Sequence, residues 1–351
     1  MNTFNRNNYL KAVRFESPDF IPMFFAINPA CWHHYDQNAL EDLMEEHKFL
    51  FPNYKRPVGF FIPEYGLDQR KNAPYKDFWG CVWETADDGI TGSVHIHPLE
   101  SWNDFDNFKA PDPETCNGMF KVNWNDIKKS VEHTKKNNLI TFGGLPHGHT
   151  FLRLQDIRGY VNLIMDMADD EPRLHKLINM LSDFNLEIIK KWVYINPDII
   201  MYPEDLGMQV GPMLSPDQFR KFIKPVYQRL MKPAREKGML VHMHSDGDIR
   251  DLIDDIIDGG VQIINLQDLV NGIDWIKGKL AGKICIDLDI DRQKITVHGS
   301  PKDIDKLIRE EVEKLGSKKG GLTMVFGLYP GTPIENVKAV MDAMEKYAGY
   351  Y

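Results

Sequence analysis

Two histidines and an aspartate at alternate positions are the most chemically suggestive group in this 351-residue sequence. His242, His244 and Asp246 end an apolar run that is typical of a buried strand. Because side chains alternate along a strand, these three share one face, and Val241 and Met243 share the other. Imidazole nitrogens and a carboxylate oxygen suit Zn²⁺ or another divalent transition metal. The alternative is one neutral core histidine and one general acid or base, with no metal.

A pair of carboxylates follows another apolar run in the same way. Glu204 and Asp205 come directly after the stretch 197–202. They are candidates for a further metal ligand or for a proton-transfer pair, and the alternative is a solvated turn at the end of a strand. We therefore predict Asp205, Glu204 and His244 as the catalytic residues.

A second set of side chains is predicted to contact a substrate. Two of them are arginines that could hold a carboxylate through paired hydrogen bonds or could instead form surface ion pairs. The others lie at or after the ends of apolar runs. The set is Arg153, Arg158, Gln267, Tyr202 and His147. His33 and His34, beside Trp32 and Tyr35, are interpreted either as the wall of a pocket or as part of an aromatic core.

These side chains need a scaffold of alternating strands and helices. Eight short apolar runs read as buried strands: 20–26, 58–62, 139–142, 197–202, 239–243, 261–266, 283–286 and 322–326. Eight helical stretches alternate with most of them: 40–49, 126–136, 171–195, 216–237, 249–259, 273–280, 301–315 and 333–347. This alternation predicts an α/β fold, a (β/α)₈ TIM barrel. A doubly wound sheet is the second choice, because no G-x-G-x-x-G turn follows the first strand.

Three helices carry the same start signal. Ser215, Ser300 and Thr332 each precede a proline and are followed three residues later by a side chain that can accept a hydrogen bond. We predict all three as N-caps. The chain is predicted to be a single barrel domain over residues 1–351, and the aromatic stretch of about 63–123 is predicted to be an insertion that could cover one mouth of the barrel.

Composition narrows the class of partner. The formal net charge of −9 argues against a nucleic-acid or anionic membrane surface and favours a small molecule. The four cysteines match neither a disulfide framework nor a CxxC metal site. No long apolar stretch and no signal-peptide pattern is found, so a cytoplasmic protein is expected.

Several ordered motifs resemble the uroporphyrinogen decarboxylase superfamily, and most closely its corrinoid and coenzyme M methyltransferase branch. The stretch from Glu204 to Gln209 and the Leu214-Ser215-Pro216 block resemble its D-D-x-G-x-Q…L-S-P motif. His244-Ser245-Asp246-Gly247 resembles the H-S-C-G of the methyltransferase branch, and Gly320-Gly321 followed by the 332–337 stretch resembles G-G…T-P-x-E-N-V. The resemblance implies a (β/α)₈ barrel, in agreement with the alternation of strands and helices.

The chain departs from both branches at functional positions. The arginines that hold substrate carboxylates in the decarboxylases have no counterpart in the stretch 26–32. The methyltransferase branch binds zinc through H-x-C and a later cysteine, but this chain has Asp246 at the first cysteine and 326–329 contains none. Oxygen in place of sulfur would make a bound metal a stronger Lewis acid and a poorer partner for thiolate activation.

The resemblance implies a methyltransferase-like enzyme that acts on a small methylated substrate or a methyl-corrinoid. Zn²⁺ or another divalent metal is expected on His242, His244 and Asp246. Any corrinoid is expected on a separate partner protein, since the chain lacks a D-x-H-x-x-G module, and a homodimer is possible. Three alternatives stay open: decarboxylation of a tetrapyrrole or another carboxylate, metal-dependent hydrolysis, and a barrel that binds a ligand without catalysis.

Overall fold

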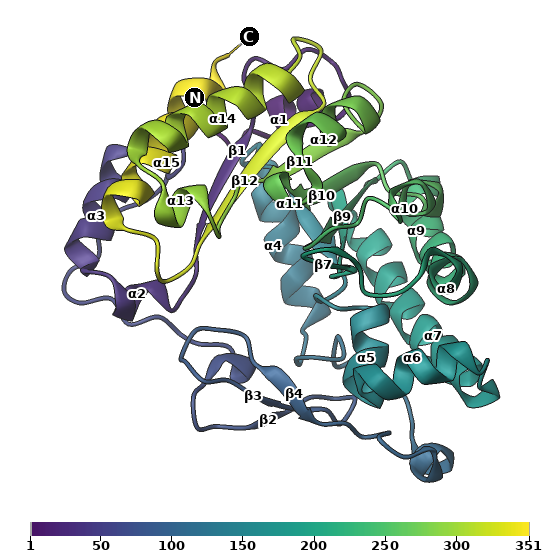
Figure 1. Ribbon diagram of the computed structural model, residues 1–351. Coiled ribbons are helices and arrows are strands. Elements are labelled where there is room, and N and C mark those ends of the chain that lie inside the picture. Colours follow the sequence, from purple (N-terminus) through teal and green to yellow (C-terminus); the bar gives the residue numbers. More distant parts are fainter. Residues whose placement is uncertain (1, 351) are drawn as a thin grey trace.

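The computed structural model describes residues 2–350 and is built around one curled parallel sheet (Figure 1). Seven strands pair in the order β1-β12-β11-β10-β9-β6-β5, and each pairing is parallel. The strands are β1 (Met23–Ile27), β5 (Phe142–Gly144), β6 (Ile199–Pro203), β9 (Leu240–Ser245), β10 (Ile263–Gln267), β11 (Cys285–Asp289) and β12 (Leu322–Leu328). The predicted barrel class is confirmed, with seven strands in the main sheet where eight were expected.

The missing strand is the predicted one at 58–62, and that prediction is wrong. These residues form an exposed loop in which Val58, Phe60 and Ile62 are 107, 78 and 76 % exposed. Gly59 has φ +91°, a left-handed conformation that interrupts an extended strand. A five-residue apolar run carries too little periodicity to distinguish a buried strand from an apolar loop.

The first helix closes the amino end of the barrel. Tyr9 of α1 (Arg6–Val13) packs between the two edge strands, with ring centroids 5.5 Å from Phe24 of β1 and 5.9 Å from Phe142 of β5. Together with Ile199 and Leu240 these side chains form an apolar cluster inside the sheet. The interior is therefore filled at the amino ends of the strands, and the polar residues gather at the carboxyl ends.

Helices surround the sheet, and the larger apolar core lies between the longer helices and the sheet. They are α2 (Cys31–His34), α3 (Gln37–Glu46), α4 (Trp124–Lys136), α5 (Phe151–Arg158), α6 (Tyr160–Ala168), α7 (Pro172–Ile195), α8 (Pro216–Gln218), α9 (Lys224–Glu236), α10 (Ile253–Gly259), α11 (Asp268–Asn271), α12 (Ile273–Lys279), α13 (Ile295–His298), α14 (Pro301–Leu315) and α15 (Ile334–Ala348). A π-helical turn, Phe219–Ile223, joins α8 to α9. No helix within residues 2–350 has both the length and the apolar composition needed to cross a membrane.

Two of the three predicted N-caps are observed. Ser215 and Ser300 form capping boxes with Gln218 and Asp303. The prediction for Thr332 is wrong, because α15 begins one residue later than expected and its N-cap position is Pro333, with no side-chain cap. The carbonyl of Thr332 instead accepts a hydrogen bond of 2.7 Å from the hydroxyl of Tyr35.

The segment between α3 and α4, residues 47–123, is called the inserted segment here; part of it forms a small antiparallel sheet. Its strands are β2 (Tyr75–Lys76), β3 (Val82–Glu84) and β4 (Ser93–Ile96), in the order β2-β3-β4. In Figure 1 this segment, drawn in blue, runs from α2 toward α5. Trp79, Cys81 and Leu99 are buried and join the main core, so the segment is packed onto the barrel. A second short hairpin, β7 (Gly207–Met208) with β8 (Gly211–Pro212), follows β6.

A buried acid on α14 gives the first testable prediction. Glu311 is fully buried and faces Asp268, and burial followed by this neighbouring carboxylate raises its pKa well above the ordinary value. The stability that this group contributes is therefore complete below the ordinary glutamate pKa and is lost as pH rises toward the folded-state pKa. Glu311→Gln is expected to raise the free energy of unfolding by about 1–3 kcal/mol at pH 8 and by less at pH 5.

Urea unfolding at the two pH values measures this difference. Glu313→Gln on the same helix is the matched control, because Glu313 is exposed, and it should change stability by less than about 0.5 kcal/mol at both pH values. An E311Q protein that is less stable than the parent at pH 8 would show that the carboxylate is accommodated without cost.

Candidate active site

A cavity of about 870 Å³ lies at the carboxyl ends of the strands. The barrel supplies most of its polar wall, and the inserted segment supplies Trp83, Val94 and Phe120 among others. Cavities at this end of a parallel barrel are where loops bring side chains from several strands together. The position and size of the cavity suit a small-molecule site.

Three neighbouring strand ends bring a metal-competent group together at this cavity. His147 follows β5, Asp205 follows β6, and His244 lies on β9. His147 Nε2 is 3.4 Å from Asp205 Oδ2, and His244 Nε2 is 3.4 Å from Asp205 Oδ1. One ligand atom from each of the three lies within 4.8 Å of the others. Two of these residues were predicted as catalytic and the third as substrate-binding.

Asn265 of β10 orients the His244 ring. Its amide nitrogen donates a hydrogen bond of 2.7 Å to the carbonyl of Asp287, which turns its amide oxygen toward His244. The oxygen can only accept, so Nδ1 of His244 donates to it. Nε2 consequently faces Asp205 and the cavity, where it can carry a proton or bind a metal.

The charges of this group are strongly coupled. Burial opposes the charged form of His244, but the hydrogen bond with Asp205 and the charges of Asp246 and Asp205 outweigh it and raise the pKa of His244 to about 9. Burial likewise opposes the charge of Asp205, yet hydrogen bonds with His147 and His244 bring its pKa far below the ordinary value. Asp205 is therefore a carboxylate and His244 an imidazolium at neutral pH when no metal is bound.

A second charged group borders the first. Arg292 Nη2 lies 2.7 Å from Asp289 Oδ2 and 3.1 Å from Asp246 Oδ1. Burial raises the pKa of Asp289 to about 7, despite the opposing charge of Arg292. His244, Asp246 and Asp289 also approach closely enough to hold a metal, but Arg292 already pairs with both carboxylates. Arg292 was not among the residues predicted from the sequence, although its place in the loop directly after β11 was an available signal.

His242 was predicted as a metal ligand with His244 and Asp246, but it lies deeper in the barrel than these two residues. It shares a strand face with His244, but it is 3 % exposed and does not line the cavity. Its Nε2 is 2.9 Å from Asp287 Oδ2, and Thr323 Oγ1 donates to Asp287 Oδ1 at 2.6 Å. His242 is thus bound to Asp287 in the barrel interior, whereas His244 and Asp246 reach the cavity.

Glu204 is turned away from the cavity, unlike its neighbour Asp205. It is fully buried, and its Oε1 accepts hydrogen bonds from Thr150 N at 2.8 Å and Leu152 N at 3.0 Å. Its Oε2 accepts from the hydroxyl of Tyr227 on α9. Burial raises its pKa to about 7. These contacts fix the start of α5 against α9, which is a structural role.

Four of the predicted substrate-binding residues also make structural contacts and do not line the cavity. Tyr202 donates to the carbonyl of Leu230 at 2.9 Å, and Gln267 Oε1 accepts from Gly247 N at 3.0 Å. The arginines are buried in ion pairs, which are Arg153 Nη1 with Asp77 Oδ2 at 2.7 Å and Arg158 Nε with Asp166 Oδ2 at 2.8 Å. Among the predicted substrate contacts only His147 lines the cavity.

The parallel sheet and the polar strand ends define a protein of the (β/α)-barrel class that carries its site at the carboxyl ends of the strands. Residues 80–347 match the family described as Uroporphyrinogen decarboxylase (URO-D). The chain therefore belongs to the URO-D family.

Known relatives agree with this assignment, and a solved structure shares the fold. The chain is 25 % identical to uroporphyrinogen decarboxylase of Thermus thermophilus over 187 residues, which is 52 % of this chain and 51 % of that protein. It is 20 % identical to the Actinobacillus succinogenes enzyme over 74 % of this chain and 73 % of that one. In the Thermus comparison the chain thus spans about half the length of the relative. A methyltransferase from Methanosarcina mazei has the same fold, with a TM-score of 0.66, 17 % identity, and coverage of 98 % of this chain and 99 % of that one.

Proposed function

We propose that this chain is a methyltransferase-like enzyme that acts on a small methylated substrate or a methyl-corrinoid, with a divalent metal at the barrel mouth. The observation that carries the proposal is the convergence of His147, Asp205 and His244 on the wall of the 870 Å³ cavity. This ligand set keeps His244 from the sequence prediction and replaces His242 and Asp246 with side chains from two other strands.

The donor set fits a metal of the zinc type. Two imidazole nitrogens and one carboxylate oxygen are common Zn²⁺ ligands, and a three-residue set leaves a coordination position for substrate. The four cysteines are buried and none of them lines the cavity, so the set contains only nitrogen and oxygen. When bound, such a metal would act as a Lewis acid that polarises a heteroatom of the substrate.

The protein side chains position the substrate around this group. Asn265 holds the His244 ring through Nδ1, so Nε2 stays directed at the cavity. Arg292 lies on the same wall, paired with Asp289 and Asp246, and the remaining N–H donors of its guanidinium could hydrogen-bond to an anionic group of the substrate. Trp83 and Phe120 of the inserted segment cover part of the cavity and reduce its contact with water. A corrinoid substrate would be delivered by a separate protein.

Decarboxylation is the second candidate, and the charge of His244 favours it. An imidazolium with a pKa of about 9 can donate a proton at neutral pH. Arg292 would hold the carboxylate that is not lost. This route uses His244 as an acid and requires no metal, so the two candidates differ in their metal dependence.

The decisive experiment follows demethylation of methylcobalamin with a panel of thiol, amine and alcohol acceptors, before and after metal is removed with EDTA. We expect activity that is lost with the metal and restored by Zn²⁺ or Co²⁺. Release of carbon dioxide from uroporphyrinogen by the metal-free protein would establish the second candidate instead. Binding of methylcobalamin without turnover of any acceptor would indicate a non-catalytic barrel.

A further inference from the structure

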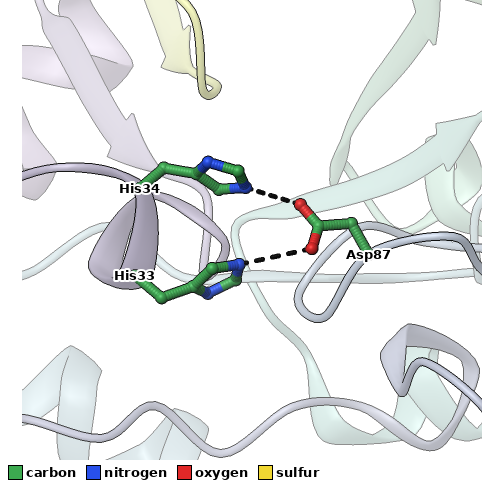
Figure 2. A group of neighbouring side chains, drawn as sticks. All are labelled: His33, His34 and Asp87. Carbon is green, nitrogen blue, oxygen red and sulfur yellow. Dashed lines mark hydrogen bonds and ion pairs between the residues drawn. The ribbon is translucent and has the colours of Figure 1, made fainter.

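A second group of potential metal ligands lies outside the proposed active site. His33 and His34, the last two residues of α2, turn their rings toward Asp87 of the inserted segment (Figure 2). His34 Nε2 is 2.6 Å from Asp87 Oδ2, and His33 Nε2 is 3.4 Å from Asp87 Oδ1. One ligand atom from each of the three lies within 4.8 Å of the others. This group shares no residue with the cavity group.

The backbone around Asp87 is held tightly against the start of α2. Gly89 has φ +85°, and a Cβ at this position would lie 2.4 Å from the backbone nitrogen of Ala30. Only glycine therefore permits this approach. The amide of Gly89 donates to the carbonyl of Gln69 at 2.8 Å, and Thr85 Oγ1 donates to the carbonyl of Asp87 at 3.0 Å. The chain fixes this loop where its carboxylate meets both histidines.

The surroundings favour a metal ligand set over an ordinary ion pair. His33 Nδ1 lies 3.0 Å from the hydroxyl of Tyr65, and a partner of this kind orients metal-binding imidazoles through their second nitrogen. Within residues 2–350 the ion pairs of Asp87 are with His33 and His34, and none is with a lysine or arginine. The three side chains are 36, 42 and 39 % exposed, which leaves room for water to complete the coordination.

We propose that His33, His34 and Asp87 bind a divalent transition-metal ion of the Zn²⁺ type, and that this ion fastens the inserted segment to α2. Two imidazoles and one carboxylate match the preferences of such ions. The site lies at the rim of the cavity, because Asn28 and Pro29 before α2 and Thr91 and Gly92 after the Asp87 loop all line it. Metal binding here would hold the two sides of the rim together.

Calorimetric titration of the full-length, EDTA-treated protein with Zn²⁺ tests the proposal. All variants carry His244→Ala, so that binding at the proposed active site does not contribute. In this background we expect about one equivalent of Zn²⁺ to bind, and either His34→Ala or Asp87→Asn to weaken its affinity at least tenfold. Zn²⁺ should also slow proteolysis of residues 58–120, and the same variants should abolish that protection.

His175→Ala is the matched control. His175 forms an exposed pair with Asp170 at 2.7 Å, with geometry like that of His34 and Asp87 but without a second histidine. It should bind Zn²⁺ as tightly as the background protein. The proposal fails if the background protein binds no Zn²⁺ at 100 µM, or if H34A and H175A differ by less than threefold in affinity. Because His244 is already replaced, failure of this site is distinguishable from failure of the proposed methyl-transfer site.

Discussion

Replacing His244 by alanine is expected to lower methyl transfer by about 10²–10⁴-fold. His244 is the residue shared by both candidate ligand groups at the cavity, with Nε2 3.4 Å from Asp205 and 3.7 Å from Asp246. Its removal takes away one of the three proposed metal ligands and leaves Asp205 without its more buried histidine partner. Metal binding should become weaker, and the substrate should be positioned less accurately.

Initial rates of methylcobalamin demethylation by Zn²⁺-loaded protein measure this loss, and Co²⁺ absorption spectra report the ligand set directly. His133→Ala is the control, because His133 is exposed on α4 and does not line the cavity. It should retain the parent rate. An H244A protein that keeps more than a tenth of the parent rate, with an unchanged Co²⁺ spectrum, would place the reaction centre elsewhere.

Replacing Arg153 by methionine is expected to destabilise the protein by about 3–5 kcal/mol. Arg153 is 2 % exposed and pairs with Asp77, whose side chain is fully buried. Asp77 also accepts hydrogen bonds of 2.9 Å from Trp79 N, Cys81 N and the Trp83 indole. Without the guanidinium the Asp77 carboxylate would be left as an uncompensated buried charge, and the inserted segment would lose its buried ion pair with α5.

Urea unfolding at neutral pH gives the free energy difference. The surface pair of Arg173 with Glu171, at 2.7 Å, provides the control, and Arg173→Met should cost less than about 1 kcal/mol. Adding Asp77→Asn to Arg153→Met should recover part of the loss, because the buried side chain is then neutral. A loss below about 1 kcal/mol for R153M would contradict the structural role of Arg153 and return it to the list of candidate substrate contacts.

The inserted segment and the barrel are coupled through both of these features. Arg153 of α5 pairs with Asp77 of the segment in the interior, and His33 and His34 of α2 contact Asp87 of the segment at the surface. Trp83 lies between Asp77 and Asp87 in the sequence and lines the cavity. The centroid of its ring is 5.7 Å from Cζ of Arg153. Substitutions in this segment should therefore affect substrate binding as well as the stability of the protein.

The sequence by itself determined the alternation of strands and helices, and with it the barrel class. Apolar runs and helix start signals such as Ser215 and Ser300 are local patterns. They depend on residues that are close in the sequence, so they can be recognised without knowledge of the tertiary structure. The same reasoning placed His244 and Asp205 at one mouth of the barrel, where both line the cavity, because polar residues at the ends of buried parallel strands meet at one end of the sheet.

Only the tertiary structure decided which side chains share a site. Arg153 looked like a substrate contact because its partner, Asp77, lies 76 residues earlier in the chain. His147 became a neighbour of Asp205 and His244 because β5, β6 and β9 are adjacent in the sheet. The depth of His242 below His244, and the approach of Asp87 to His33 and His34, likewise depend on how distant segments pack. The order of the strands and the depth of each side chain in the barrel are set by contacts between residues that are distant in sequence. The periodicity of a single segment does not determine these contacts.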